Sequence, residues 1–273
     1  MRVIAKYPVD LHMHSIKSDG EMSPKALVQR AVSRSLKAIA ITDHDTVAGV
    51  EEALEAAAEH ELDIVPAIEV SAWLDREIHI LGFFIDHTCP ALAARLDALA
   101  ANRQDRIREI CDRLDEVGCP LDARTIIENA HGGVGRPHVA KAMVEAGYVK
   151  TFDDAFRRYL GSQGDAYVPA ARLSAADAIS LIHDANGVTS IAHPGPNQLE
   201  AKIPALKDVG LDAVEVGHPA HSATTQTQLR FIAAQHDLAI TGGSDLHYRN
   251  GPCNLGQMGM TEQELDTLKT ITV

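Results

Sequence analysis

The sequence contains few aromatic residues and few cysteines, and each shortage excludes a class of protein. Aromatic residues make up only 4% of the chain, so a core has to be built from Ala, Val, Ile and Leu within the 45% of residues that are hydrophobic. No Cys-x-x-Cys pair occurs among the four cysteines, which are Cys89, Cys111, Cys119 and Cys253. Scattered thiols in a chain of this length indicate reduced cysteines in a cytoplasm and exclude a disulfide framework.

Two further features are missing: an excess of basic residues and a long apolar run. The chain has 25 Lys and Arg against 38 Asp and Glu, a net charge of −13, whereas nucleic-acid binders usually carry a basic face. We therefore expect no stable complex with nucleic acid. No run approaches the ~18 apolar residues of a membrane span, and no charged-then-apolar leader is present. The sequence predicts a soluble cytoplasmic protein without membrane association, and it leaves the oligomeric state open.

Strand and helix signals alternate in the first part of the chain and again after about residue 170. The expected strands are 3–11, 38–42, 64–70, 78–84, 188–192, 213–216 and 238–241. The expected helices are 23–35, 47–60, 175–185, 203–209 and 224–236. Repeated strand–helix units predict parallel strands joined by right-handed crossovers, and therefore an α/β barrel or an open sheet.

The strand signal disappears between these two parts. Residues 92–117 carry leucine and isoleucine at helical spacing, and shorter helices are expected at 123–129, 137–145 and 152–160. We therefore expect one α/β domain formed by residues 1–92 and 168–273, interrupted by a helical insertion over residues 93–167.

Pairs of histidine and carboxylate residues follow two of the expected strands. His12 and His14 are two residues apart, so both side chains point to the same face. Asp245 and His247 repeat this spacing near the C-terminus. Imidazole and carboxylate groups together suit divalent Zn, Mn or Fe. The pair of His12 and His14 alone is also explained by polar residues at a strand edge.

Two candidates lie in turns near the N-terminus. Asp19 stands before Gly20, which is also an ordinary turn signal. His44 lies between two aspartates after a buried strand. A cap for the next helix explains Asp45, but capping gives no role to His44, which we therefore interpret as a metal ligand.

Three more candidates are weak when each is taken alone. Glu69 ends an apolar run, where a carboxylate is either buried and paired or bound to a metal. His79 fits a core histidine, and His193 precedes a proline in a turn. The candidates gain weight because all of them lie at strand ends or in the turns that follow: His12, His14, Asp19, His44, Glu69, His79, His193, Asp245 and His247. Together they predict one multi-metal hydrolytic site at the face where barrel enzymes carry their active sites.

The motifs resemble, in their order, those of the PHP (polymerase and histidinol phosphatase) family, which is related to the amidohydrolases. The matching segments are DLHMHS at 10–15, TDHD at 42–45, Glu69, IHILG at 78–82, AHP at 192–194 and GSDLH at 243–247. This resemblance implies a distorted (β/α)7 barrel. The helical segment around GRPHVA at 135–140 is similar to the insertion of a subgroup that contains 3′,5′-nucleotide bisphosphate phosphatases and 5′-to-3′ exonucleases of short RNA.

The resemblance also implies three divalent ions, with Mn expected first and Fe or Zn as alternatives. The implied ligand groups are His12, His14, Glu69 and Asp245 for the first ion, Glu69, His79 and His193 for the second, and Asp19, His44 and His247 for the third. Metal binding lowers the pKa of water toward about 7. Attack on phosphorus by a hydroxide that bridges two ions is therefore expected.

The remaining site residues concern protons and substrate. Asp43 and His218 are candidates for acid–base catalysis, and Asp245 could instead orient the hydroxide. Arg136 precedes a helix that begins at Pro137, which suits a phosphate, although an ordinary surface loop explains it equally well. The other candidates for substrate binding are His138, Lys141, Arg172, His218 and Ser71.

The expected function is removal of the 3′-phosphate from nucleoside 3′,5′-bisphosphates, which converts pAp to AMP and phosphate. The helical insertion would act as a cap that selects the substrate, and the 5′-phosphorylated ends of short RNA are a further expected substrate. Alternatives are a histidinol-phosphate phosphatase or another small phosphomonoesterase, an amide hydrolase, and a non-catalytic metal-binding module. The sequence does not decide between a mononucleotide and an oligonucleotide.

Overall fold

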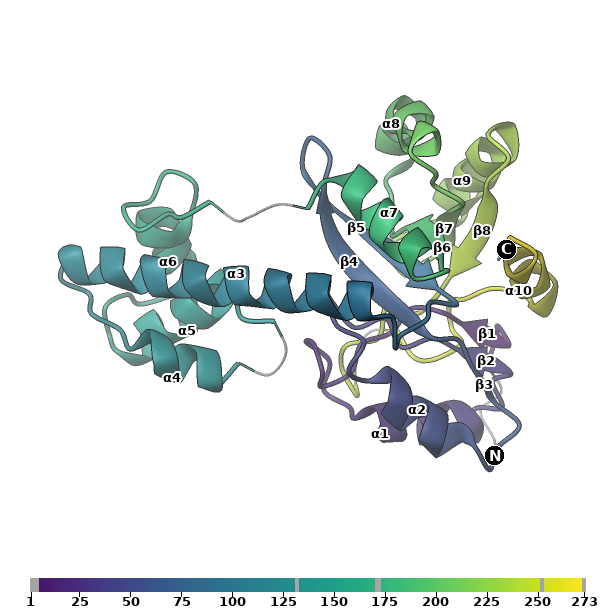
Figure 1. The fold of residues 1–273 in the computed structure, drawn as a ribbon, viewed down its shortest axis with the longest axis horizontal. Coiled ribbons are helices and arrows are strands. Elements are labelled where there is room, and N and C mark those ends of the chain that lie inside the picture. Colours follow the sequence, from purple (N-terminus) through teal and green to yellow (C-terminus); the bar gives the residue numbers. More distant parts are fainter. Residues whose placement is uncertain (1–4, 131–132, 170–172, 251–252, 272–273) are drawn as a thin grey trace. The chain divides into compact units, whose positions relative to one another are not determined.

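The computed structural model describes residues 5–130, 133–169, 173–250 and 253–271 (Figure 1). The chain forms two compact units. The first unit combines Met1–Ala93 with Leu173–Val273, and the second is Ala94–Arg172. Apolar side chains pack into separate clusters within the two units, so each unit is described by itself.

The first unit is a mixed α/β structure with two sheets. The smaller sheet is parallel and has the order β1 (Val9–Asp10), β2 (Ala38–Ile39) and β3 (Asp63–Ile64). The larger sheet has the order β4 (Ala67–Trp73), β5 (Glu77–Phe83), β6 (Val188–Ile191), β7 (Ala213–Gly217) and β8 (Ala239–Gly242). The expected run 64–70 is divided between β3 and β4, because Pro66 has no N–H to donate to a strand ladder.

The prediction of parallel strands is wrong for two pairs. β4 pairs with β5, and β5 with β6, in antiparallel orientation, whereas β6, β7 and β8 are parallel. Because the chain reverses over Leu74–Arg76 without a crossover helix, β5 returns directly along β4. In the described residues the named strands do not close a barrel, and the two sheets are linked by single bridges, His44 to Glu69 and Met13 to Leu246. The mixed α/β class is confirmed.

Within its described residues the first unit contains six helices, and their ends follow local sequence signals. They are α1 (Pro24–Ser33), α2 (Val50–Ala57), α7 (Ala175–Asp184), α8 (Pro196–Asp208), α9 (Ala223–Gln235) and α10 (Glu262–Lys269). The Ser23 hydroxyl caps α1 by accepting from the Ala26 N–H at 3.2 Å. Helix α8 begins well before the expected residue 203, with proline at its first position. Helix α10 was not predicted and starts with a capping box of Thr261 and Glu264.

The core of the first unit is aliphatic, as the scarcity of aromatic residues requires. One cluster joins side chains of both sheets, among them Val9, Leu81, Val188 and the fully buried Phe83. Figure 1 shows α1 and α2 beside the small sheet and α7, α8 and α9 beside the large one. Burial of these apolar faces is what holds the strand ends in place.

The second unit is helical. It contains most of α3 (Pro90–Glu116), α4 (Ala123–Glu128), α5 (Arg136–Glu145), α6 (Phe152–Ala155) and a π-helical turn at Phe156–Leu160. Its core packs Ile107, Ile110 and Leu114 of α3 against Met143 of α5 and Leu160. No helix in the described parts of the chain has both the length and the apolar character needed to cross a bilayer.

Candidate metal centre

The strands of the first unit bring the predicted histidines and carboxylates together from distant parts of the sequence. His12 and His14 follow β1, His44 follows β2, and His193 follows β6. Asp245 and His247 follow β8. The bridges between His44 and Glu69 and between Met13 and Leu246 align these segments.

The expected position of Glu69 at a strand end is wrong. Glu69 lies within β4, and His79 lies within the neighbouring β5. The side chains of alternate residues in a strand point to one face, so both side chains can reach the centre from inside the sheet.

Glu69 stands at the middle of the cluster and is buried, with an exposed fraction of 1%. Its two oxygens divide the surrounding histidines into two sets. The Oε2 atom lies 3.3 Å from His12 Nε2, 3.2 Å from His14 Nε2 and 3.3 Å from His44 Nδ1. The Oε1 atom lies 2.9 Å from His79 Nδ1 and 3.4 Å from His193 Nε2. A carboxylate in this position has the geometry to bridge two ions.

Asp245 and Asp19 occupy opposite sides of His14. Asp245 Oδ1 lies 3.3 Å from His12 Nε2 and 3.2 Å from His14 Nε2. Asp19 Oδ1 lies 3.5 Å from His14 Nδ1, and its Oδ2 lies 3.3 Å from His247 Nε2. Each ring nitrogen of His14 therefore faces a carboxylate, and His247 lies near both, since its Nδ1 is 3.5 Å from Asp245 Oδ1.

All nine predicted ligands take part in groups whose donor atoms lie within 4.8 Å of one another. These groups are His14, Asp19, His44 and His247; His12, His14 and Asp245; His12, Glu69 and His193; and His44, Glu69 and His79. A further group consists of His12, Glu215 and His218. The groups share members, so the centre is one continuous cluster of ligands.

Several nitrogen and oxygen atoms that could bind a metal are buried in this cluster without a hydrogen-bond partner among the described residues. They are both ring nitrogens of His14, Nδ1 of His44, Oε1 of Glu69 and Nδ1 of His79. An unsatisfied buried polar atom costs about 1–3 kcal/mol, so a fold that keeps several in one place needs something to bind them. The donor set of imidazole nitrogens and carboxylate oxygens fits divalent ions of the Mn, Fe and Zn type.

The charges of the cluster shift the pKa values of its members in opposite directions. Burial alone would lower the pKa of His14, but contacts with Asp245 and Glu69 raise it to about 9. Burial would likewise lower the pKa of His79, and contacts with Glu69 and Glu77 raise it to about 10. For His44 burial prevails, and its pKa falls to about 4. Without ions, His14 and His79 therefore hold protons that an ion must displace.

Glu215 is a residue of the site that the sequence analysis missed. It lies in β7 and is fully buried. Its Oε1 lies 2.8 Å from His12 Nδ1, and its Oε2 accepts the His193 N–H at 2.7 Å. Burial would raise the pKa of Glu215, but its contacts with His12 lower it. The signal was present, since Glu215 interrupts an apolar strand in the way that Glu69 does.

Asp43, predicted for acid–base catalysis, has its carboxylate occupied. It accepts from the Ser15 N–H at 2.7 Å, the Ser15 hydroxyl at 2.6 Å and the Ser18 hydroxyl at 2.6 Å. The residue is buried, with an exposed fraction of 2%. These contacts favour a positioning role, in which Asp43 holds the loop that carries Asp19.

His218 and Ser71 have different surroundings. The Nδ1 of His218 accepts the Ala220 N–H at 3.1 Å, so its Nε2 can carry a proton toward Asp245 Oδ2, which lies 3.1 Å away. Ser71 donates its N–H and its hydroxyl to Asp45 at 2.8 and 2.7 Å. The structure thus aims His218 at the centre and ties the hydroxyl of Ser71 to a neighbouring carboxylate.

Three residues in or beside the centre hold left-handed backbone conformations that side chains disfavour. The φ angles are 51° for Asp45, 33° for His193 and 48° for Asp245. Such conformations cost of order 1 kcal/mol each and persist where the surrounding structure imposes them. The turns at His193 and Asp245 follow β6 and β8, and both side chains join ligand groups that contain His12. The carboxylate of Asp45 instead accepts from Ser71.

The predicted substrate-binding residues of the insertion lie in the second unit. Arg136 donates from Nη1 to the Leu160 carbonyl at 3.0 Å, and its guanidinium lies 5.6 and 5.8 Å from the ring centroids of Phe156 and Tyr167. The Nδ1 of His138 accepts the Gly135 N–H at 3.2 Å. Lys141 forms an exposed ion pair with Glu145 at 3.9 Å. Arg172 lies outside the described residues. A role for these residues toward substrate stays a prediction.

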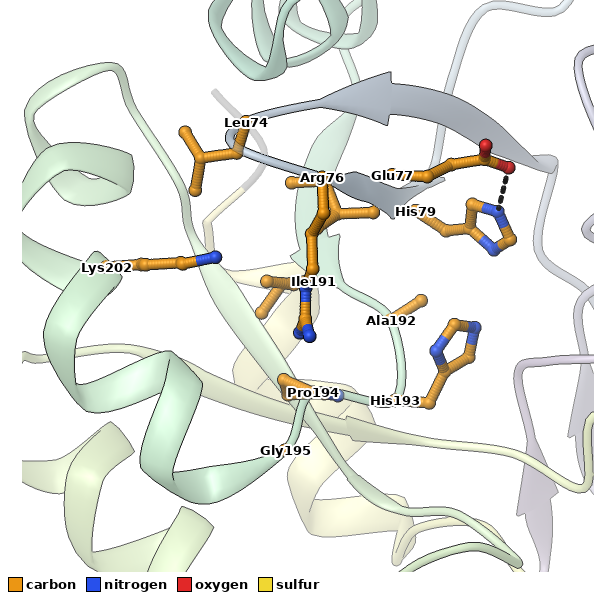
Figure 2. Close-up of a pocket in the computed structure, with 11 residues that line it drawn as sticks. Leu74, Arg76, Glu77, His79, Ile191, Ala192, His193, Pro194, Gly195 and Lys202 are labelled. Atoms are coloured by element: carbon orange, nitrogen blue, oxygen red, sulfur yellow. Dashed lines mark ion pairs between the residues drawn. The ribbon is translucent and has the colours of Figure 1, made fainter. Parts of the chain in front are cut away.

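A pocket of about 100 Å³ adjoins the metal candidates on the side of Glu69 Oε1 (Figure 2). His79 and His193 form one of its walls. The other walls come from the turn between β4 and β5, the end of β6 and helix α8, and they include Leu74, Arg76, Ile191 and Lys202.

Known proteins resemble this chain over nearly its full length. Residues 10–112 match the PHP domain. The chain is 36% identical to a 5′-3′ exoribonuclease of Haemophilus influenzae, over 95% of this chain and 96% of that protein. It is 34% identical to a 3′,5′-nucleoside bisphosphate phosphatase of Chromobacterium violaceum, over 88% and 87% of the two chains. A solved structure from Bifidobacterium adolescentis, assigned as a metal-dependent phosphoesterase, superposes with a TM-score of 0.80 at 32% identity and covers 97% of this chain and 96% of its own.

Proposed function

Because the chain belongs to the PHP domain family and is a metal-dependent phosphoesterase, we propose that it removes the 3′-phosphate from nucleoside 3′,5′-bisphosphates and converts pAp to AMP and phosphate. The observation that carries this proposal is the arrangement of five histidines around the two oxygens of Glu69. The likeness to a named bisphosphate phosphatase and to named exoribonucleases supports the choice of substrate.

Three divalent ions, with Mn the first choice, are proposed for this centre. The ligands would be His12, His14, Glu69 and Asp245 for one ion, Glu69, His79 and His193 for another, and Asp19, His44 and His247 for the third. Bound divalent ions supply water that is acidic near neutral pH and positive charge for the transferred phosphoryl group.

The protein's own residues prepare this site in two ways. Glu215 holds the His12 ring through Nδ1 and leaves Nε2 directed at Glu69 and Asp245. This is the arrangement by which a carboxylate fixes the tautomer and orientation of a ligating histidine. His218 is proposed to hold a proton at Nε2, next to Asp245, and to pass it on to the leaving oxygen or to a water.

The helical unit is proposed to select the substrate. Its candidates for substrate binding are Arg136, at the start of α5, with His138, Lys141 and Arg172. Ser71 is the candidate from β4. Short RNA with a 5′-phosphate is proposed as a further substrate class, because named exoribonucleases are among the relatives.

Competition between substrates tests the assignment. The Mn-loaded protein is expected to show a kcat/KM for adenosine 3′,5′-bisphosphate well above the values for histidinol phosphate and for an aryl phosphate. A higher kcat/KM for histidinol phosphate would overturn the proposed substrate and leave the phosphoesterase assignment in place.

A further inference from the structure

Two positively charged side chains line the pocket beside His79 and His193. Neither is a ligand of the proposed ions, so metal binding does not explain their presence. Figure 2 shows the side chains of Arg76 and Lys202 reaching toward the same space from two different walls. Arg76 comes from the turn between β4 and β5, and Lys202 comes from helix α8. The two cations therefore converge although 126 positions, from 76 to 202, separate them in the sequence.

The surroundings of the two cations differ. Lys202 forms an ion pair with Asp75, whose side chain is 66% exposed. Arg76 forms no ion pair within the described part of the chain. An exposed pair such as that of Lys202 contributes little to folding stability, so the convergence of both cations on one pocket has no evident structural purpose.

Glu77 also lines the pocket, where its carboxylate lies 3.9 Å from His79 Nε2. The start of helix α8 adds to the positive side of the balance. Gly195 lines the pocket and is the N-cap of this 13-residue helix. A glycine has no side chain that could accept hydrogen bonds from the first turn, and the N-terminus of a helix attracts anions. A phosphate held at such a helix end beside Arg and Lys gains charge-assisted hydrogen bonds.

The pocket's size limits what enters it. Its volume of about 100 Å³ is well below the ~300–1,000 Å³ of pockets that enclose a whole small-molecule ligand. One phosphate group fits this description better than an entire nucleotide. The apolar walls of Leu74, Ile78 and Ile191 suit the less polar atoms that would follow the phosphate.

We propose that Arg76, Lys202 and the N-terminus of α8 bind a second phosphate group of the substrate while the phosphate to be removed lies at the metal candidates. The proposal rests on the proposed function. His79 and His193 contact both Glu69 and the pocket, so the two phosphates would be held within one nucleotide of each other. The second phosphate is either the 5′-phosphate of a bisphosphate or the neighbouring diester of an oligonucleotide.

Binding and turnover together test this subsite. The variants are Arg76→Ala, Arg76→Lys and Lys202→Ala, with Lys207→Ala as the matched control. Lys207 lies on the same helix, donates to the Asp237 carbonyl at 3.1 Å and does not line the pocket. The probe is an analogue of adenosine 3′,5′-bisphosphate in which a methylene group replaces each ester oxygen, so that neither phosphonate can be hydrolysed. Calorimetry of the Mn-loaded protein measures its Kd.

The expected result is a Kd raised about tenfold or more in Arg76→Ala and Lys202→Ala, as the loss of a charge-assisted hydrogen bond predicts. Arg76→Lys should recover part of the lost affinity, and Lys207→Ala should bind the analogue with the Kd of the protein without substitutions. The kcat/KM for an aryl phosphate, which has one phosphate, should stay within about twofold. An equal loss on the aryl phosphate would overturn the subsite. So would an unchanged Kd in both alanine variants combined with an unchanged KM for a 5′-phosphorylated trinucleotide.

The KM values of the variants for two substrates show which kind of phosphate occupies the subsite. A rise in KM for adenosine 3′,5′-bisphosphate assigns the subsite to the 5′-phosphate. A rise confined to a 5′-phosphorylated trinucleotide, in which a second diester follows the one to be cleaved, assigns it to the diester. Failure of the proposed function is recognised separately, because the unchanged protein would then hydrolyse the aryl phosphate and release nothing from the bisphosphate, whatever the analogue's Kd.

Discussion

Glu215 Oε1 lies 2.8 Å from His12 Nδ1, and both side chains are fully buried. This contact decides which edge of the imidazole faces the centre, since the opposite nitrogen, Nε2, lies 3.3 Å from Glu69. The second oxygen of Glu215 holds the backbone N–H of His193. One carboxylate therefore positions a histidine on each side of Glu69.

Replacing Glu215 with glutamine tests this positioning role. Glutamine has nearly the same shape but no negative charge, so His12 loses the anion that fixes its ring. We expect metal affinity to fall by about 10–100-fold, the range typical when such a supporting carboxylate is lost, with the far-UV circular dichroism unchanged. The matched control is Glu51→Gln, which alters an exposed carboxylate 3.1 Å from His87. Equal metal affinity in Glu215→Gln and the unchanged protein would exclude the role.

Glu69→Gln is expected to reduce the number of bound ions and to abolish turnover. Its two oxygens contact histidines of two sets, so the loss of charge weakens more than one ion site. Metal content after dialysis, measured by mass spectrometry, and the melting curve are the readouts. Glu51→Gln, at an exposed carboxylate 3.1 Å from His87, which is not a proposed ligand, should retain full metal content. A variant that unfolds at room temperature would instead indicate a purely structural metal role.

Metal binding should release protons, and its affinity should rise with pH. In the metal-free protein the pKa of His14 is raised to about 9 and that of His79 to about 10. Both groups therefore hold protons at pH 7.5, and an ion must displace them. Burial would lower the pKa of His12, but the carboxylates of Glu215 and Glu69 raise it as well. Calorimetric titration with Mn in buffers of different ionisation enthalpy should therefore show more than two protons released per protein. Affinity that is constant between pH 6.5 and 8.5 would contradict the raised pKa values.

Asp43→Asn is expected to loosen the loop that carries Asp19. The substitution leaves one oxygen acceptor where three donors now bind, and unsatisfied buried groups cost about 1–3 kcal/mol each. The melting temperature should fall, while the acidic and basic limbs of the pH–rate profile should keep their positions. Asp86→Asn, at an exposed aspartate that accepts from Thr88 in a similar way, should change stability little. If Asp43→Asn removed one limb of the profile, Asp43 would be the acid or base after all.

The sequence contained enough information to find the residues of the centre because their signals recur. His12 and His14, and likewise Asp245 and His247, have the two-residue spacing that places both side chains on one face, and each pair follows a short strand. The local signals cannot show that Glu69 would stand between five histidines, because that arrangement depends on how distant strands pair.

Other features could not be predicted because hydrophobic periodicity carries no information on strand direction. β4 and β5 have the apolar character of buried strands, but only the short turn at Leu74–Arg76 makes them antiparallel. The pocket formed by Arg76 and Lys202 depends on that turn and on the start of helix α8, which lies before the expected residue. Glu215 was overlooked because a single carboxylate in a strand becomes informative only when its histidine partners are known.

The identity of the product formed from adenosine 3′,5′-bisphosphate tests the central claim most directly. The Mn-loaded protein should release one phosphate and leave adenosine 5′-monophosphate, identified by chromatography against both monophosphate isomers. Formation of adenosine 3′-monophosphate, or no release from a protein that hydrolyses an aryl phosphate, would contradict the assignment of the 3′-phosphate to the centre around Glu69.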